Sequence, residues 1–342
     1  MAQEPRVLES QTEWRSDDVA DPAAWMEVFS APEREELDAA LRQVLAEGRG
    51  PLEIGQEEFA LPGLTARLAK IEQGLIDGLG FVVLRGLPRD AYSQEEMELL
   101  YWGIGMHLGS PWPQNQRGHV LGDVLDQGKS ATDPTSRGNE LGGALDFPYH
   151  SDGSDLVGLL CLQKARTGGA SAVANAVTIH NDLVREAPEL AAALYEPQPY
   201  DYRGEQGPDS RPYYEMPVFT DWKGRLFVRY IRPYILASQR HEGVPRITPL
   251  AEQAMQRLDA MTLDPAYNAT MTLEPGDMLF VNNYHVLHAR KAYVDDPEAG
   301  VVRHLKRLWL ETRVLEDRPP YFRNNPASHW AEKRSVSRLA PN

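Results

Sequence analysis

A histidine and an aspartate are separated by one residue in the segment FPYHSDGSD, residues 147–155. In extended backbone, residues i and i+2 point to the same side, so His150 and Asp152 could aim at one point in space. An imidazole and a carboxylate placed in this way are a potential chelating pair for a metal ion. The alternative is a surface turn in which the aspartate caps a free backbone N–H group.

A second triplet with the same spacing, His180-Asn181-Asp182, shows that the spacing alone is not diagnostic. Asn181 and Asp182 begin a helix-like run, where such side chains cap the first backbone N–H groups. We therefore interpret His180 and Asp182 as structural. The first triplet instead precedes a strand-like run, which leaves metal binding open.

A facial metal site needs a third ligand, and the candidates lie in PGDMLFVNNYHVLHARKAY, residues 275–293. Pro275-Gly276 indicates a turn, DMLFV a strand, and NNYH a second turn before VLHARKAY. His285 falls in that second turn, whereas His288 falls inside the following strand. We predict His288 as the third ligand, with His285 as the alternative.

Two imidazoles and one carboxylate on one face of an octahedral ion suit non-haem Fe(II) and leave three positions open. A bidentate 2-oxo acid and O2 would fill those positions, and the distant carboxylate of 2-oxoglutarate would also need a cation. The run VVRHLKRLWLETR supplies candidates, because Arg303, Leu305, Arg307 and Trp309 share one face of a strand. One arginine could hold the cosubstrate and the other could meet an anionic substrate, although either could instead form a salt bridge on an edge strand.

The predicted secondary structure that positions these side chains changes along the sequence from helices to short strands. The first 80 residues have a polar, helical pattern, with runs at 30–48 and 64–80 that end near glycine. The β-branched run FVVLRGLP (81–88) predicts a strand, and a Ser-x-x-Glu start predicts a helix over 93–109.

From about residue 118 onward, short strand-like runs are separated by Gly, Pro, Asp and Asn. The best candidates are HVLGDVLD, DLVGLLCLQKA, ASAVANAVTI, RLFVRYI, NATMTLEPGDMLFVNN and VVRHLKRLWLETR, with helices expected at 181–195 and 248–262. Many short strands without regular βαβ alternation favour an antiparallel sandwich or barrel with helices packed outside. The sequence therefore predicts a mainly β fold with flanking helices (α+β).

We expect a single domain over residues 1–342, because no linker is evident in the sequence. Residues 1–80 would form a helical N-terminal region packed on the core. Residues 81–313 would hold the core with its inserted helices, and residues 314–342 would form a C-terminal tail.

The composition limits the classes of function. Lys and Arg number 35 against 50 Asp and Glu, which gives a formal net charge of −15 and a pI near 5.1. Such a surface repels phosphate backbones and anionic lipids, so we expect neither nucleic acid nor membrane as a partner. No apolar run is long enough to span a membrane, and no secretory signal is recognisable at the N-terminus. The single cysteine, Cys161, fits a buried thiol in a reducing cytoplasm.

With His150-x-Asp152, NNYHVLHAR and RHLKRLWL in this order, the chain resembles the taurine dioxygenase-like (TauD/TfdA) family of Fe(II)/2-oxoglutarate oxygenases. The resemblance covers roughly residues 75–313 and includes GFVVLRGL and GGASAVANA. It implies a double-stranded β-helix (jelly-roll) core of the clavaminate synthase-like or TauD-like type. The iron ligands it implies are His150, Asp152 and His288.

The resemblance also implies roles for three further residues. Arg303 and Ser171 would bind 2-oxoglutarate, with Ser171 standing where threonine is commoner, and Arg307 falls on the family's sulfonate-binding arginine. The implied activity is that of a 2-oxoglutarate-dependent dioxygenase (EC 1.14.11.-) with Fe(II) as cofactor and 2-oxoglutarate and O2 as cosubstrates. It would hydroxylate a small organic molecule, or otherwise oxidise an unactivated C–H bond, giving succinate and CO2.

The main substrate does not follow from the resemblance. The lead-in LDFPYH departs from the pattern of the taurine enzymes, and the helical N-terminal region is long for one, so we do not assign taurine. Residues that could line the substrate pocket are Asn115 within 112–124, Asp146, Tyr149 and Arg307. Asp146 could meet an amine.

Two alternatives belong to other classes of protein. A cupin-type Zn or Mn lyase or isomerase could use the same jelly roll, but it would need a fourth ligand and would have no use for Arg303. A non-catalytic binding protein could retain the fold, but the intact triad and arginine argue against it. From the resemblance we also expect a homo-oligomer.

Overall fold

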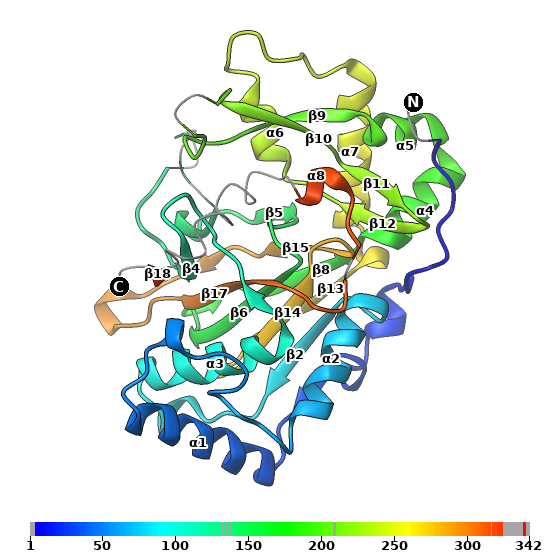
Figure 1. The fold of residues 1–342 in the computed structure, drawn as a ribbon. Coiled ribbons are helices and arrows are strands. Elements are labelled where there is room, and N and C mark those ends of the chain that lie inside the picture. The colour runs from blue at the N-terminus through cyan, green and yellow to red at the C-terminus, as the bar shows by residue number, and fades with distance from the viewer. Residues whose placement is uncertain are drawn as a thin grey trace.

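Two β-sheets face each other at the centre of the protein, with helices below them and hairpins and further helices above (Figure 1). This arrangement comes from a computed structural model that describes residues 4–323, except 131–132, 134–135, 137, 208–209 and 316, together with residues 338–339. The β-rich core with flanking helices is the fold class that the sequence predicted.

The larger sheet, over the described residues, has the strand order β1-β2-β14-β6-β17-β4-β18, with β3 paired to β17. Its neighbours are antiparallel except for the pairs β1–β2 and β4–β18. The bounds are Met26–Val28 (β1), Phe81–Arg85 (β2), Ser110–Pro111 (β3), His119–Val124 (β4), Leu156–Gln163 (β6), Met278–Asn282 (β14), His304–Glu311 (β17) and Arg338–Leu339 (β18).

The smaller sheet is antiparallel and has the order β13-β8-β15-β5. Its strands are Asn268–Met271 (β13), Ser171–Asn175 (β8), Val286–Arg290 (β15) and Phe147–His150 (β5). A short hairpin-like pair, β7 (Thr167–Gly168) and β16 (Tyr293–Val294), lies beside it.

Alternating apolar side chains join the two sheets. Val157 and Val281 of the larger sheet belong to the same buried cluster as Val173 and Val286 of the smaller one. Because successive side chains of a strand point to opposite faces, each strand also offers a second set of side chains to the helices. The two sheets therefore enclose a shared layer of buried apolar side chains.

Helices from the N-terminal part of the chain cover the outer face of the larger sheet (Figure 1). They are α1 (Ala31–Ala46), α2 (Thr65–Asp77) and α3 (Gln94–Leu108). The start of α3 is fixed as predicted, since Ser93 Oγ accepts from the Glu96 N–H at 3.2 Å and the Glu96 carboxylate accepts from the Ser93 N–H at 2.8 Å. Strand β1 lies in the region predicted to be helical and adds an edge to the sheet.

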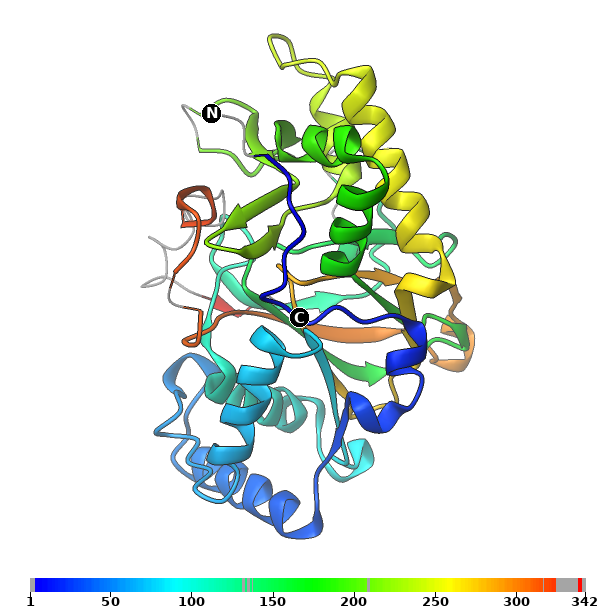
Figure 2. The same cartoon turned by 90° about the vertical axis from the view of Figure 1, so that its right-hand side faces the viewer.

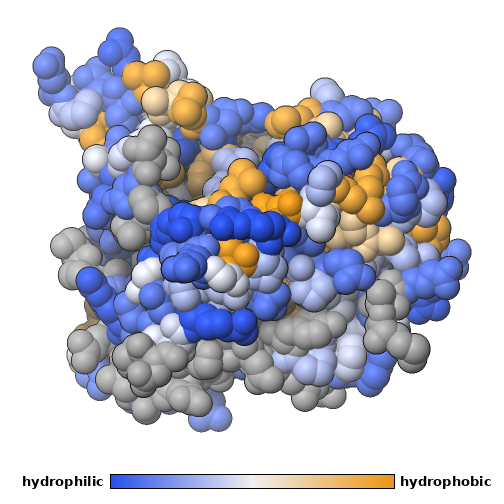
Figure 3. Space-filling view, turned by 90° about the horizontal axis from the view of Figure 1, so that it is seen from above, coloured by the Kyte–Doolittle hydropathy of each residue, from blue (hydrophilic) through white to orange (hydrophobic). Residues whose placement is uncertain are grey.

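Hairpins and helices lie above the smaller sheet (Figures 1 and 2). We call residues 197–238 the roof segment; it contains β9 (Pro197–Asp201), β10 (Tyr213–Pro217), β11 (Phe219–Trp222), β12 (Arg225–Val228) and α6 (Arg232–Ser238). Beside it pack α4 (Ala176–Glu186), α5 (Pro188–Tyr195) and α7 (Pro249–Leu263). Seen from above, this part of the surface is mostly hydrophilic, with apolar residues in separate small patches (Figure 3).

The predicted capping of a helix by Asn181 and Asp182 is wrong. Helix α4 begins five residues earlier, where the Asn175 side chain accepts from the N–H groups of Val177 and Thr178, both at 2.9 Å. Asp182 lies inside the helix, where its carboxylate accepts a hydrogen bond from Tyr267 Oη at 2.8 Å.

The predicted tail, residues 314–342, lies largely outside the described residues. The described part includes α8 (Pro320–Arg323) and β18. No helix in the described part of the chain is long and apolar enough to cross a membrane.

Candidate metal centre

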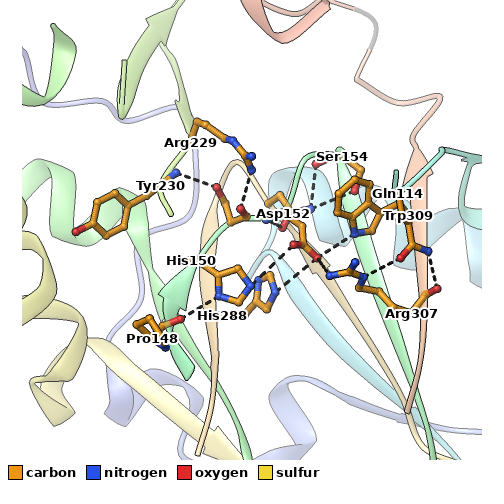
Figure 4. A network of polar contacts seen from close by, with 12 residues as sticks. Gln114, Pro148, His150, Asp152, Ser154, Arg229, Tyr230, His288, Arg307 and Trp309 are labelled. Atoms are coloured by element: carbon orange, nitrogen blue, oxygen red, sulfur yellow. Dashed lines mark hydrogen bonds and ion pairs between the residues drawn. The ribbon is translucent and has the colours of Figure 1, made fainter. Parts of the chain in front are cut away.

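Strands β5 and β15 bring the two predicted histidine ligands face to face. In their antiparallel pairing His150 lies directly opposite His288, and the two ring centroids are 4.2 Å apart. Asp152 completes the group, with Oδ1 3.9 Å from His150 Nε2 and Oδ2 4.0 Å from His288 Nε2 (Figure 4). Ligand atoms of the three side chains all lie within 4.8 Å of one another, and this cluster has three members among the described residues.

The backbone around Asp152 is held by contacts from distant parts of the chain. The Ser151 N–H donates to the Tyr230 carbonyl at 2.8 Å, and the Tyr230 N–H donates to Ser151 Oγ at 3.0 Å. The Asp152 N–H donates to Asn283 Oδ1 at 2.9 Å. The segment that connects β5 to β6 is therefore anchored to two distant parts of the chain.

Neighbouring side chains also orient the ligand atoms. The Nδ1 atom of His150 lies 3.0 Å from the Pro148 carbonyl, so its protonated Nδ1 leaves Nε2 to face Asp152. Trp309 Nε1–H donates to Asp152 Oδ2 at 2.9 Å, and an Arg307 Nη1–H donates to the same oxygen at 3.4 Å. These contacts fix the orientation of the carboxylate before any ion arrives.

The protonation states suit metal binding. Burial lowers the pKa of His150 and lowers the pKa of His288 to about 3, so both imidazoles are neutral near pH 7. Burial alone would raise the pKa of Asp152, but the charge of Arg307 and the neighbouring imidazoles hold that pKa well below its usual range. A neutral imidazole pair and an ionised carboxylate are the forms that ligate a metal.

His285, the alternative ligand, lies elsewhere. Its Nε2 is 2.8 Å from the carbonyl oxygen of Thr12, and the residue is fully buried. The turn that contains it ends before β15 begins at Val286, as the sequence predicted. The donor set available here is thus two nitrogens and one oxygen on one side, which is the set found around non-haem Fe(II) with open positions.

A cavity opens beside the cluster, between the sheets and the roof segment. Its described lining includes Ser171 from β8 together with Arg303, Leu305, Arg307 and Trp309 from around β17. The alternate residues of the RHLKRLWL segment therefore face the same space. From above, the roof segment contributes Asp201, Tyr202, Tyr214, Arg229, Ile231 and Tyr234.

The buried guanidinium of Arg303 forms no ion pair with a carboxylate of the described residues. It lies over the Tyr293 ring, 5.3 Å from the centroid, while Asp295 Oδ1 accepts from the Arg303 backbone N–H at 2.8 Å. Burial and the nearby charge of Arg290 lower its pKa to about 10. Such a group favours the approach of an anion.

Three of the predicted substrate contacts lie outside the described cavity wall. Tyr149 points away because it alternates with His150 on β5, and its ring is buried in the apolar core. Asp146 accepts from the Ala292 N–H at 2.7 Å and pairs with Lys291 at 3.3 Å. Asn115 is used in its own turn, where Oδ1 accepts from the Arg117 N–H at 3.0 Å.

Two further arginines line the cavity that were not predicted as site residues from the sequence, Arg229 and Arg290. Arg229 comes from the roof segment, and nothing in its local sequence marks it. Arg290 could have been found, because it lies two residues after His288 on the same strand and therefore on the same side.

Comparisons with known proteins agree with this geometry. Residues 42–309 match the family described as "Taurine catabolism dioxygenase TauD, TfdA family". The FR-33289 synthase of Streptomyces rubellomurinus is 31% identical over 303 residues, which span 87% of this chain and 88% of that protein. The taurine hydroxylase-like protein SAT17 of Stachybotrys chartarum is 27% identical over 283 residues, covering 80% and 71% of the two chains.

Solved structures show the same fold. An asparagine oxygenase in complex with Fe(II), 2S,3S-3-hydroxyasparagine and succinate superposes with a TM-score of 0.67 at 19% identity. The superposition covers 86% of this chain and 97% of that one.

Proposed function

The chain belongs to the taurine catabolism dioxygenase TauD, TfdA family, and we propose that His150, Asp152 and His288 hold its catalytic iron. The protein is an Fe(II)/2-oxoglutarate-dependent dioxygenase that oxidises a small molecule. The observation that carries the proposed ligand set is the placement of Asp152 almost equidistant from the two facing imidazoles. The family assignment replaces the alternative of a cupin-type Zn or Mn lyase or isomerase.

Arg303 and Ser171 are the proposed contacts for the far carboxylate of 2-oxoglutarate. Both line the cavity beside the metal cluster, and both are buried. A planar guanidinium can donate two parallel hydrogen bonds to a carboxylate, and the serine hydroxyl can donate a third. When bound, iron and 2-oxoglutarate supply the oxidation of an unactivated C–H bond, with succinate and CO2 as the products of the cosubstrate.

The residues of the protein would bind and orient the cosubstrate and shield it from water. Arg303 and Ser171 would fix one end of 2-oxoglutarate, so that its 2-oxo acid end lies toward the three ligands. The aromatic side chains of the roof segment would exclude water from the space above them. Trp309 and Arg307 would hold the Asp152 carboxylate in one orientation throughout.

The main substrate is proposed to be an anionic small molecule. The described cavity wall carries four arginines against two aspartates, and one of those aspartates is the ligand Asp152. Two of the arginines contact the metal-binding segment, Arg307 through Asp152 Oδ2 and Arg229 through the Ser151 carbonyl. Arg229 donates to the Ser151 carbonyl at 2.8 Å and to Tyr214 Oη at 3.2 Å, and no carboxylate among the described residues lies within 4.0 Å of it.

Arg229 and Arg307 are therefore the proposed substrate contacts. They take the place of Asn115, Asp146 and Tyr149, whose side chains are engaged or buried outside the cavity wall. Oligomeric state and a cytoplasmic location remain predictions.

Titration calorimetry tests the function without a known main substrate. Protein loaded with Mn(II) should bind 2-oxoglutarate, and the Arg303→Ala variant should bind it hundreds-fold more weakly, because removing one partner of a buried charge pair typically costs about 3–5 kcal/mol. Arg257→Ala, which breaks an exposed ion pair with Glu186 and lies outside the cavity wall, should retain this affinity. Succinate formation by the Fe(II) protein in air, screened with small sulfonates, phosphates, phosphonates and carboxylates, should then identify the substrate class. Absence of 2-oxoglutarate binding with either metal would contradict the proposal.

A further inference from the structure

We propose that Arg290 is a second guanidinium contact for the far carboxylate of 2-oxoglutarate, beside Arg303. The proposal rests on the proposed function, since it concerns the same cosubstrate. Arg290 ends the segment NNYHVLHAR, but the resemblance gave it no role in binding the cosubstrate.

The strand register places Arg290 at the cosubstrate end of the cavity. Arg290 is the last residue of β15, two residues after His288, and its direct partner on β8 is Ser171. Directly opposite residues of an antiparallel pair have Cβ atoms roughly 4.5–5.5 Å apart and share one face of the sheet. Arg290 therefore lies next to Ser171, and both line the cavity.

The contacts of Arg290 leave part of its guanidinium unsatisfied. Nη2 donates to the Gly142 carbonyl at 3.2 Å, but Nη1 is buried and has no hydrogen-bond partner among the described residues. No carboxylate in the described part of the chain lies within 4.0 Å of it. A buried donor without an acceptor is unfavourable, and a ligand that accepts from it removes that penalty.

Arg290 and Arg303 converge on one aromatic ring. Their guanidinium carbons lie 4.8 and 5.3 Å from the centroid of Tyr293. Both positive charges therefore lie near one ring, and an anion within reach of both guanidiniums would offset their mutual repulsion. A carboxylate has lone pairs for about four donors, enough for two guanidiniums and the Ser171 hydroxyl together.

The location favours the cosubstrate over the main substrate as the ligand of Arg290. Arg229 and Arg307 lie beside Ser151 and Asp152, whereas Arg290 is paired with Ser171 and stacks on the ring that also carries Arg303. A bound 2-oxoglutarate whose far carboxylate reaches Arg303 and Ser171 would place that carboxylate within reach of Arg290.

A truncated ligand gives a direct test. In 2-oxopentanoate a methyl group replaces the far carboxylate of 2-oxoglutarate, while the 2-oxo acid end is unchanged. Both acids are titrated calorimetrically into the Mn(II)-loaded protein and its variants, so that no turnover occurs. Arg290→Met should weaken 2-oxoglutarate by about tenfold or more, as expected for a hydrogen bond between charged groups, and should leave 2-oxopentanoate nearly unchanged.

Matched variants separate the possible outcomes. Arg229→Met removes an arginine from the same cavity and should leave the preference for 2-oxoglutarate over 2-oxopentanoate intact. Arg290→Lys keeps a cation and should lose less of that preference than Arg290→Met; it also carries the test if the methionine variant does not fold. The ratio of the two affinities is read within one variant, so a general loss of stability does not imitate the effect.

Equal weakening of both acids by Arg290→Met, or no weakening of either, would overturn the proposal. If Arg290→Met changed only the affinity for the main substrate, Arg290 would belong to the substrate pocket instead, and the proposal would also fail. The proposed function fails separately, when the wild-type protein shows no preference for 2-oxoglutarate and Arg303→Met has no effect.

Discussion

The clustered side chains owe their geometry to residues that the HSD motif does not contain. Asn283 holds the backbone of Asp152, Tyr230 holds that of Ser151, and Trp309 orients the Asp152 carboxylate. Outer contacts of this kind typically change metal affinity by about 10–100-fold when they are lost. Three distant segments of the chain therefore hold the Asp152 backbone and carboxylate in place.

Replacement of His288 tests the ligand set at the scale of one residue. His288→Ala should abolish Mn(II) binding by calorimetry and reduce succinate formation by the Fe(II) protein below detection. His285→Gln is the matched control, because a glutamine can still donate to the Thr12 carbonyl and the residue lies outside the cluster. Loss of metal binding in His285→Gln with retention in His288→Ala would reverse the assignment.

The sequence predicted the positions of those single side chains that depend on local backbone geometry. The i, i+2 rule for extended backbone predicted that His150 and Asp152, and likewise Arg303 and Arg307, would lie on one side, although β5 ends at His150 and β17 begins at His304. Arg229 could not be predicted in the same way, because its position depends on the folding of the roof segment over Ser151. Tyr149 lies outside the cavity wall because it alternates with His150 on β5, whereas Asp146 and Asn115 are held by Ala292 and Arg117.

Among the elements, the turn before β8 limits where Arg303 can lie. Gly168 and Gly169 have φ values of +75° and +76°, in the left-handed region that favours glycine. A Cβ atom on Gly169 would lie 3.0 Å from Arg303 Nε and 3.1 Å from its Cδ. The double glycine therefore allows the arginine side chain to pass directly over the backbone.

A Gly169→Ala substitution should separate backbone strain from displacement of Arg303. The left-handed conformation should cost about 1–2 kcal/mol of unfolding free energy, and the new methyl group should push Arg303 aside and weaken 2-oxoglutarate binding by roughly tenfold. Gly243→Ala is the control, because φ is +73° there and no atom lies within 4 Å of the new Cβ. Urea denaturation should show similar losses in both variants, while calorimetry should show weaker 2-oxoglutarate binding only in Gly169→Ala.

Most elements could be predicted because their patterns are strong. The predicted helix over 93–109 became α3 (Gln94–Leu108), and the helix over 248–262 became α7 (Pro249–Leu263). The helix predicted over 181–195 is instead α4 and α5, and it begins earlier than its polar residues suggested. The apolar run that precedes Asn181 looked like a continuation of the strand, and a β-branched run of this kind does not distinguish a buried strand from a buried helix.

In the whole molecule, a buried carboxylate ties the C-terminal segment to the metal-binding loop. Asp155, from the same HSDGSD segment, accepts from Tyr284 Oη at 2.7 Å, from the Thr312 N–H at 2.9 Å and from Arg318 Nε at 2.9 Å. Burial raises the pKa of this carboxyl even though these donors oppose the shift. Asp155 thus has a structural role next to residues that carry chemistry, and the division into one domain with a tail remains a prediction.

Asp155→Asn should be strongly destabilising. The amide leaves the Arg318 guanidinium without its anion in a largely buried site, and breaking such a pair typically costs about 3–5 kcal/mol. Glu274→Gln removes an exposed pair with Lys164 and should cost less than about 1 kcal/mol. Urea denaturation at pH 7 measures both, and equal small losses would mean that the Asp155 network contributes little.

The stability of the metal-free protein should fall as the pH drops below about 6.5. Burial lowers the pKa of His180 and of His285 from 6.5 to about 4, so in this window the unfolded chain binds protons that the folded chain excludes. The free energy of unfolding should therefore decrease between pH 6.5 and 4, by up to about 1.4 kcal/mol per pH unit for each histidine, and these two should add no further loss below pH 4. His285→Gln removes one of the two groups and keeps a donor for the Thr12 carbonyl, so urea denaturation at pH 7, 5.5 and 4.5 should give a shallower pH dependence in this variant. His150 and His288 contribute equally to the pH dependence of both proteins when metal is absent. If the unfolding free energy of His285→Gln had the same pH dependence as that of the wild-type protein, folding would not lower the pKa of His285.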